Sequence, residues 1–335
     1  MLLTTYSPFS YLPEELCLTI FSMLDAKDLC QVARTCKRFQ KSAQNSFLCR
    51  EKIANFFIHL RAQVCITDDV LIKALPPGPP SVSCDFLLSV ERSRKAPITK
   101  KSLDALSHRF PHLRSFCLIT TDVSQFSEIT EDALVAFIRS QTNLSAIALT
   151  GMPQITESGY KKIVQSAQQL REIWIQSDEI SDSLVQTLLD THPQLQTLKI
   201  CGRSEKMSDA TLKAVGACCQ KMQECDIRIY HPSFSTGRTK KFLQKLTAVE
   251  KLTLQGTKKV TNHIIATVTR RLPNLKILYL GNCTAITIQA IKDLARTNIE
   301  FLDLLTCPNP QELCEEVEKQ KKKNGFKKLS CYDIA

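Results

Sequence analysis

A pattern of three apolar residues recurs along most of this chain, and it constrains the fold more than any other feature. Each copy has one apolar residue followed by others three and five positions later, at 24- to 31-residue intervals. A weaker copy begins near Val82. The copies begin at Leu113, Leu144, Leu170, Leu195, Met222, Val249, Leu275 and Ile299, and a further start is expected at Phe326. The spacing of the apolar residues within each copy predicts a short strand. A unit this short cannot bury its apolar face alone, so adjacent units must stack.

Each predicted strand is followed by a loop and an amphipathic helix. Residues 128–138 (EITEDALVAFI), 179–189 (EISDSLVQTLL) and 206–215 (KMSDATLKAV) show this pattern, with Thr or Ser before an acidic residue as a helix cap. A tandem strand-plus-helix unit of this length resembles the leucine-rich repeat. Cys283 and Cys307 lie eight residues after their repeat starts, which resembles the cysteine-containing subclass, and Gly151 and Gln255–Gly256 occupy that turn elsewhere. The predicted fold class is α/β, a horseshoe solenoid with parallel strands on the concave face and helices outside.

Strand geometry assigns the faces of the repeats. Side chains alternate along a strand, so the start, +3 and +5 residues point into the core and the +2, +4 and +6 residues face the concave surface. The +4 column is Cys117, Ala148, Trp174, Lys199, Asp226, Thr253, Tyr279 and Asp303. The flanking columns add Glu172, Gln176, Glu224, Arg228, Lys251, Ile277 and Phe301.

The single Trp of the chain lies in the +4 column, and aromatic residues are enriched at protein-binding surfaces. We therefore predict a target-protein surface made of Trp174, Lys199, Asp226, Arg228, Lys251, Tyr279, Phe301 and Asp303. The alternative is that Trp174 packs under a neighbouring loop.

The N-terminal fifty residues have helical rather than strand periodicity. Leu12, Leu16, Ile20 and Leu24 recur every four positions, a second helix follows Asp25, and a third is expected near residue 46. The segment LPEELCLTIFSMLDAKDLCQVARTCKRF closely resembles the F-box, over residues 9–52. That resemblance implies binding to the Skp adaptor of a cullin-type ubiquitin ligase. The implied apolar contacts are Leu12, Pro13, Leu16, Ile20, Phe21 and Leu24.

Two residues depart from the F-box pattern. Phe39 and Cys49 stand where the family often has Trp, so both aromatic anchors are smaller and the strength of adaptor binding is left open. The alternative is that these helices only cap the N-terminus of the solenoid.

The proline-rich segment 76–80 (PPGPP) suits neither a helix nor a central strand. It predicts a boundary between the helical part and the repeats. We expect an F-box-like helical module at 9–52, a helical linker at 53–80, and a solenoid of about eight to nine repeats at 81–335.

The 15 cysteines include no CxxC pair and no Cys/His cluster at metal-ligand spacing. We therefore expect a reduced intracellular chain without metal or cofactor, in the cytoplasm or the nucleus. The first dozen residues lack the basic start and apolar run of a Sec-type export signal. A bacterial effector acting in the host cytosol stays an open alternative.

The formal charge of +11 is concentrated in three clusters, one of which is Arg238, Lys240, Lys241 and Lys245. Solvated surface is the simpler interpretation, and attraction to an acidic partner, nucleic acid or anionic lipid is the functional one. Because no aromatic residues interleave with the basic ones, we do not expect nucleic acid or membrane partners.

The sequence contains no nucleotide-binding or hydrolase motif, and none of the six histidines pairs with another at metal-binding spacing on a helix. Cys225–Asp226 is the nearest approach to an activated thiol, but Cys225 occupies an inward position. We therefore predict a non-catalytic subunit of a ubiquitin ligase, monomeric apart from its complex. Its F-box would bind the Skp adaptor and its concave face a target protein. The alternative is a scaffold outside any ligase.

Overall fold

The computed structural model describes residues 68–69, 72, 84–90, 98–120, 126–202, 205–218, 221–229, 234–254, 260–304 and 307–324. The predicted F-box helices and the strand expected near Phe326 lie outside these residues. The strands are β1 (Cys84–Val90), β2 (Leu113–Thr120), β3 (Ala146–Thr150), β4 (Glu172–Gln176), β5 (Thr197–Gly202), β6 (Glu224–Ile229), β7 (Lys251–Thr253), β8 (Ile277–Tyr279) and β9 (Phe301–Asp303). The helices are α6 (Lys100–Arg109), α7 (Glu131–Ser140), α8 (Glu157–Ser166), α9 (Asp182–Thr191), α10 (Asp209–Cys218), α11 (Thr236–Leu243), α12 (Asn262–Arg271), α13 (Ile288–Leu294) and α14 (Pro310–Asn324).

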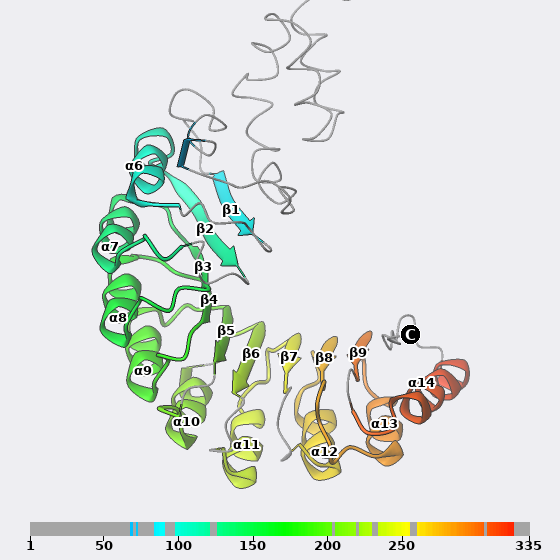
Figure 1. Ribbon diagram of the computed structural model, residues 1–335. Coiled ribbons are helices and arrows are strands. Elements are labelled where there is room, and N and C mark those ends of the chain that lie inside the picture. The colour runs from blue at the N-terminus through cyan, green and yellow to red at the C-terminus, as the bar shows by residue number, and fades with distance from the viewer. Residues whose placement is uncertain are drawn as a thin grey trace, which may run out of the picture.

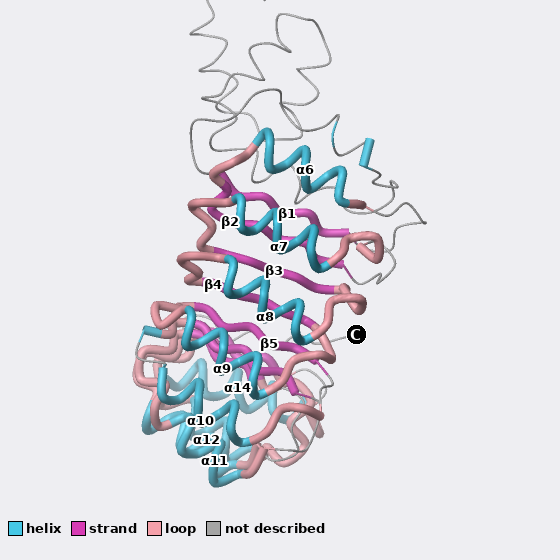
Figure 2. Tube along the Cα trace, turned by 90° about the vertical axis from the view of Figure 1, so that its left-hand side faces the viewer, coloured by secondary structure: helices cyan, strands magenta, loops and turns pink. Residues whose placement is uncertain are grey.

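The described strands form one parallel sheet whose spatial order, β1 to β9, is the order of the sequence. One helix follows each strand, and the helices form an outer row around the curved sheet (Figure 1). Seen from the side, the helices of successive repeats run alongside one another over the strands (Figure 2). This arrangement confirms the predicted leucine-rich-repeat solenoid, and β1 is the weak repeat expected near Val82.

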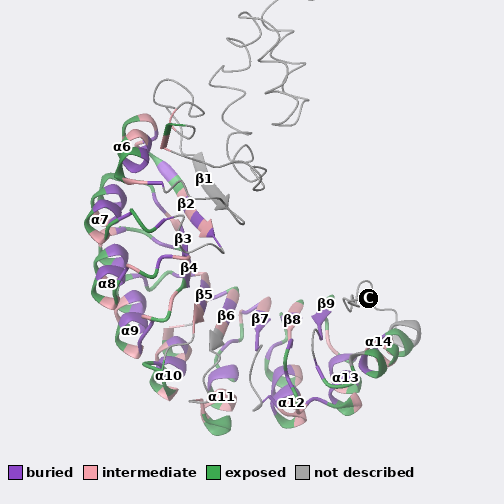
Figure 3. Ribbon diagram, in the orientation of Figure 1, coloured by how far each residue is buried: buried purple, intermediate pink, exposed green. Residues whose placement is uncertain are grey.

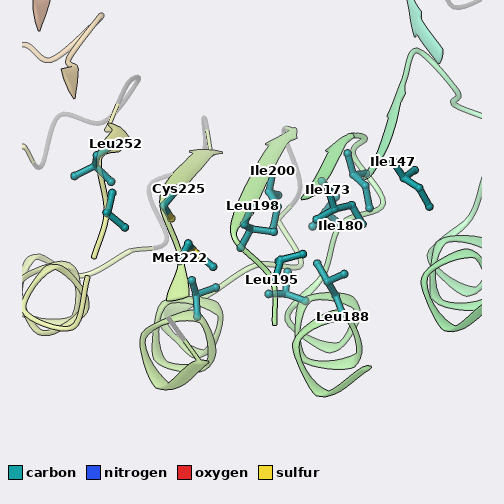
Figure 4. Packing of buried hydrophobic residues seen from close by; sticks show 14 of the residues in the cluster. Ile147, Ile173, Ile180, Leu188, Leu195, Leu198, Ile200, Met222, Cys225 and Leu252 are labelled. Carbon is teal, nitrogen blue, oxygen red and sulfur yellow. The ribbon is translucent and has the colours of Figure 1, made fainter. Parts of the chain in front are cut away.

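The core lies between the sheet and the helices, on the positions that the apolar pattern predicted. In one repeat Leu195 and Ile200 are 3% exposed and Leu198 is fully buried; in the next, Met222 and Cys225 take the corresponding places (Figure 4). Burying one such side chain stabilises the fold by about 1.5–3 kcal/mol. The exposed residues of the helices lie on the outer surface (Figure 3). The solenoid is therefore held by a continuous apolar layer that every repeat extends.

The predicted Thr and Ser helix caps are present. Thr130 Oγ1 accepts a hydrogen bond from Ala133 N at 3.2 Å, and Ser181 Oγ accepts one from Leu184 N at 3.0 Å. Each cap satisfies a backbone N–H that the first turn of a helix leaves without an intrahelical partner.

A second set of bonds links the start of one helix to the next. Asp182 Oδ1 accepts from Ser208 N at 2.9 Å and Thr211 N at 3.0 Å, and Asp182 Oδ2 accepts from Ser208 Oγ at 2.6 Å. Equivalent bonds join Glu131 to Thr156 and Asp209 to Ser235. We call Glu131, Asp182 and Asp209 with these partners the cap ladder. It ties successive repeats together at their helix N-termini.

The helical residues before the proline-rich segment are bonded to the solenoid in the same way. Asp68 Oδ1 accepts from Thr99 N at 2.9 Å and from Ser102 Oγ at 2.6 Å, and Asp68 Oδ2 accepts from Thr99 Oγ1 at 2.6 Å. Arg109 Nη1 also donates to Ile72 O at 2.8 Å. These bonds hold Asp68 at the N-terminus of α6 in the same manner as the cap ladder holds one helix start to the next.

The turns after the strands hold the predicted glycine and cysteines. Gly151 has φ +72°, and a Cβ there would lie 2.4 Å from Thr120 Cγ2. Cys283 and Cys307 are buried, and their thiols donate to the carbonyl oxygens of Leu254 and Leu280 of the preceding repeats, at 3.3 and 3.2 Å. The cysteines therefore serve as buried side chains that connect one turn to the next.

One histidine differs from the sequence interpretation. His192 stands beside Pro193 at a repeat junction, as a loop residue would, but it caps α9 and is only 3% exposed. Its Nε2 lies 2.8 Å from Val164 O, and burial lowers the pKa of the imidazole. Its place in the core follows from the end of α9, which the adjacent proline does not reveal. Within the described residues, no helix is long and apolar enough to cross a membrane.

Candidate functional site

The concave columns predicted from the repeats are true rows in the sheet. Strand pairing aligns Ala148, Trp174, Lys199, Asp226, Thr253, Tyr279 and Asp303 side by side. A neighbouring row contains Glu172, Thr197, Glu224, Lys251, Ile277 and Phe301. Adjacent parallel strands are about 4.8 Å apart, so long side chains in these two rows can contact one another directly.

Glu224 is the centre of the contacts on this face. Its Oε1 lies 3.1 Å from Lys199 Nζ and 2.7 Å from Lys251 Nζ, so one carboxylate oxygen holds an ammonium group from each flanking strand. The Glu224 side chain is 18% exposed. Because the carboxylate is this enclosed, its ion pairs are screened less by solvent than those of a fully exposed residue.

Both lysines also lie over aromatic rings. Lys199 Nζ is 5.8 Å from the centre of the Trp174 ring, and Lys251 Nζ is 5.6 Å from that of Tyr279. Tyr279 in turn contacts Phe301, with ring centres 5.4 Å apart and planes tilted by 49°. These are favourable cation–π and tilted aromatic geometries. We call Trp174, Lys199, Glu224, Lys251, Tyr279 and Phe301 the concave cluster.

A pocket of about 170 Å³ opens in this face and is lined by five members of the concave cluster together with Gln176, Ile200, Cys201 and Asp226. Burial by itself would lower the pKa of Lys251, but the hydrogen bond and charge of Glu224, with Tyr279 and Asp226, raise it above its ordinary value. Lys251 is therefore charged at neutral pH. The pocket thus offers aromatic surface beside charged groups whose positions are already set.

Two of the predicted contact residues are less accessible than a surface site would suggest. Asp226 and Asp303 are each 8% exposed. Each has one longer neighbour in the same row, Lys199 beside Asp226 and Tyr279 beside Asp303. The backbone of Arg228 pairs with Cys201 in the sheet, and its side chain lies outside the described part.

The predicted target-binding residues did not include Glu224, although it lay in a flanking concave column. A lone acidic residue between two lysines on adjacent strands is the signal that could have found it. The separation in sequence, 25 residues to Lys199 and 27 to Lys251, becomes contact only once the register is known.

The candidate thiol is part of the core. Cys225 is 1% exposed and belongs to the apolar core. Thiols in such surroundings are poor nucleophiles. Among the described residues, no group of three or more His, Cys, Asp or Glu is placed to hold a metal ion.

Comparison with known proteins supports the two parts of the chain separately. Residues 9–52 match the F-box-like family model. No curated protein sequence gives a significant match. A solved structure from yeast, the complex of Rad7 and Elc1, matches with 14% identity and a TM-score of 0.56, over 93% of this chain and 86% of that one. The leucine-rich repeat-containing protein LegL7 from Legionella pneumophila matches with 12% identity and a TM-score of 0.47, over 81% and 89% of the two chains.

The chain therefore combines an F-box-like segment with a leucine-rich-repeat solenoid. At 14% identity the match to the yeast structure supports the fold alone, and any function must be argued from the residues of this chain.

Proposed function

We propose that this protein is the substrate-recognition adaptor of a Skp–cullin–F-box ubiquitin ligase. The observation that carries the proposal is the combination of an F-box-like segment at residues 9–52 with a solenoid whose concave face holds the concave cluster. One end would bind the ligase, and the other would bind the protein to be modified.

The F-box-like segment would dock the Skp adaptor through Leu12, Pro13, Leu16, Ile20, Phe21 and Leu24. These residues occupy the Leu-Pro start and the apolar positions that make such contacts in the family they resemble. The match of the family model over the same residues supports this docking role. The similar yeast solenoid was solved together with a second protein, Elc1, which is consistent with a partner-bound role.

The concave cluster would hold the target protein. Trp174, Tyr279 and Phe301 offer aromatic surface, and aromatic side chains dominate the energetics of protein interfaces. Glu224 fixes Lys199 and Lys251 before binding, so less side-chain freedom is lost when a partner arrives. A target held here would have its lysines kept close to the ligase, which raises their effective concentration. The role is positioning rather than chemistry, and the burial of Cys225 supports it.

The ligase role is tested by replacing two F-box residues together, Leu12→Ala and Ile20→Ala. We expect the Skp adaptor to co-purify with the wild-type protein and to be lost from the double variant, because both changes remove apolar contact area. The control variant is Trp174→Ala, which should keep the adaptor. A folded double variant that still binds the Skp adaptor would contradict the proposal. A wild-type protein that binds no Skp adaptor would instead favour a scaffold outside the ligase.

The proposal places the protein in the cytoplasm or nucleus of a eukaryotic cell.

A further inference from the structure

The convex side of the solenoid carries a group of cations that the fold does not neutralise. Arg238, Lys240, Lys241 and Lys245 belong to α11 or follow it directly. None of them forms an ion pair with a carboxylate in the described part of the chain. Six other lysines there do form such pairs: Lys100, Lys161, Lys199, Lys206, Lys251 and Lys276. We call Arg238, Lys240, Lys241 and Lys245 the α11 basic patch.

The helices beside α11 leave this charge uncompensated. α11 and α12 contain no Asp or Glu, and the one acidic residue of α10, Asp209, accepts hydrogen bonds from Ser235 N and Oγ at 2.8 and 2.5 Å. On the α12 side, Lys240 Nζ lies 3.1 Å from the Nε2 of exposed His263 rather than near a carboxylate. The positive field of the patch is therefore directed at solvent.

Lys241 lies at the centre of the patch. It is exposed, with Arg238 three residues before it on the helix surface and Lys245 two residues beyond the end of α11. Lys241 therefore has a cation on each side along the chain and no acidic residue beside it. A cation in the last turn of a helix interacts favourably with the helix dipole, which accounts for one basic residue here, whereas the patch contains four.

We propose that the α11 basic patch is a second docking surface, which binds an acidic, carboxylate-rich segment of a partner protein. The patch lies on the outer row of helices, away from the concave face, so both surfaces can be occupied at once (Figure 1). The charge of the patch is complementary to such a segment and is free to pair with it.

The observations favour an acidic protein segment over other polyanions. α11 packs between α10 and α12 in the curved outer row of helices, so it is not a protruding helix of the kind that enters a nucleic-acid groove (Figure 1). The only Phe, Tyr or Trp residue of α10, α11 and α12 is Phe242, which is 4% exposed and offers no stacking surface for bases. The apolar residues of α11 are buried, so none is available to insert into a lipid surface.

Direct binding by the full-length protein tests the proposal. The probe is a fluorescent decaglutamate peptide, followed by anisotropy, with a DNA duplex and phosphatidylserine vesicles as separate arms at the same ionic strength. We expect Lys241→Glu to weaken peptide binding by about fivefold or more, because one attraction becomes a repulsion. The matched control is Lys292→Glu on α13, an exposed lysine with the same change of charge, which should retain affinity within about twofold.

Thermal unfolding separates binding from folding. Lys241→Glu gains a favourable pair with Arg238 but places an acidic residue in the last turn of α11, so these small effects oppose each other and the melting temperature should change little. If it does fall, Lys245→Glu, also exposed, replaces it in the binding assay. Equal losses in the patch and control variants would overturn the proposal, since only net charge would then matter. Tighter binding to DNA or vesicles than to peptide, with the same dependence on Lys241, would also overturn it. The Leu12→Ala and Ile20→Ala variant should bind the peptide normally, which keeps this test independent of the ligase proposal.

Discussion

At the scale of single residues, Trp174 joins the aromatic surface of the concave face to its charged network. It lines the pocket, and Lys199 lies over its ring while bonded to Glu224. Replacing Trp174 with Ala would remove aromatic contact area from the concave face, and it would also remove the cation–π contact of Lys199.

We predict that Trp174→Ala weakens binding to the target protein by about 2 kcal/mol, roughly 30-fold in Kd. Isothermal titration with the purified target is the appropriate measurement. Gln186→Ala, an exposed change on α9 of the same repeat, should leave the affinity unaltered. An unchanged Kd for Trp174→Ala would remove this residue as an anchor.

Gly151 makes a prediction about stability instead of binding. Its φ of +72° disfavours any side chain by about 1–2 kcal/mol, and an added Cβ would also lie 2.9 Å from Thr120 O. We expect Gly151→Ala to lower the free energy of unfolding by about 2 kcal/mol or more. Denaturant unfolding measures this.

The matched control is Gly237→Ala in α11, where an added Cβ meets no atom within 4 Å. There Ala should be neutral or stabilising by about 0.5–1 kcal/mol, because it limits the unfolded chain and favours helix. Equal effects at the two positions would show that the turn at Gly151 does not have the conformation described.

At the scale of elements, the cap ladder makes the contacts between repeats sensitive to acid. Partial burial would raise the pKa of Asp182, but the hydrogen bonds from Ser208 and Thr211 outweigh it and keep the pKa below the ordinary value of 3.8. Hydrogen bonds from Thr156 likewise hold the pKa of Glu131 below 4.5. Both carboxylates therefore favour the folded state when they are ionised.

We predict that the melting temperature is insensitive to these groups above about pH 5 and falls as the pH drops below about 4.5. A carboxylate whose pKa is lower in the folded state contributes stability above its unfolded pKa and loses it as pH falls through the folded one. Asp182→Asn should lower the melting temperature at pH 7 and reduce the loss between pH 5 and 3. Asp132→Asn, at an exposed position of α7, serves as control. A variant with the same pH profile as wild type would contradict this role for Asp182.

The elements and the core could be read from the sequence because one local pattern specifies them. The apolar positions of the described repeats, such as Leu195, Leu198 and Ile200, repeat at fixed spacing and are buried except for the partly buried Ile227. The cap ladder and the Glu224 contacts could not be read in this way, since they depend on side chains from different repeats. The register between strands brings Lys199, Glu224 and Lys251 together, and only the structure supplies it.

The burial of Asp226 and Asp303 also depends on side chains from different repeats. Strand alternation correctly assigns both residues to the concave face, but alternation contains no information about the length of the neighbouring side chains. Each of these short carboxylates lies beside one longer side chain, Lys199 for Asp226 and Tyr279 for Asp303, and each is 8% exposed.

At the scale of the whole molecule, an F-box-like segment precedes, in the sequence, a solenoid with two surfaces of different chemistry. The concave cluster is aromatic with compensated charge, whereas the α11 basic patch is cationic without compensation. An adaptor that positions one protein on a ligase needs only the first of these. The α11 basic patch would allow a further protein with an acidic segment to join the same assembly.

Affinity purification from eukaryotic cells tests the adaptor role most directly, by comparing wild type, the Leu12→Ala and Ile20→Ala double variant, and Trp174→Ala. We predict that the double variant loses the Skp adaptor and cullin but keeps the target. We also predict that Trp174→Ala loses the target but keeps the ligase subunits. Loss of all partners in a folded double variant, or retention of the Skp adaptor by it, would contradict the division of roles between the F-box-like segment and the solenoid.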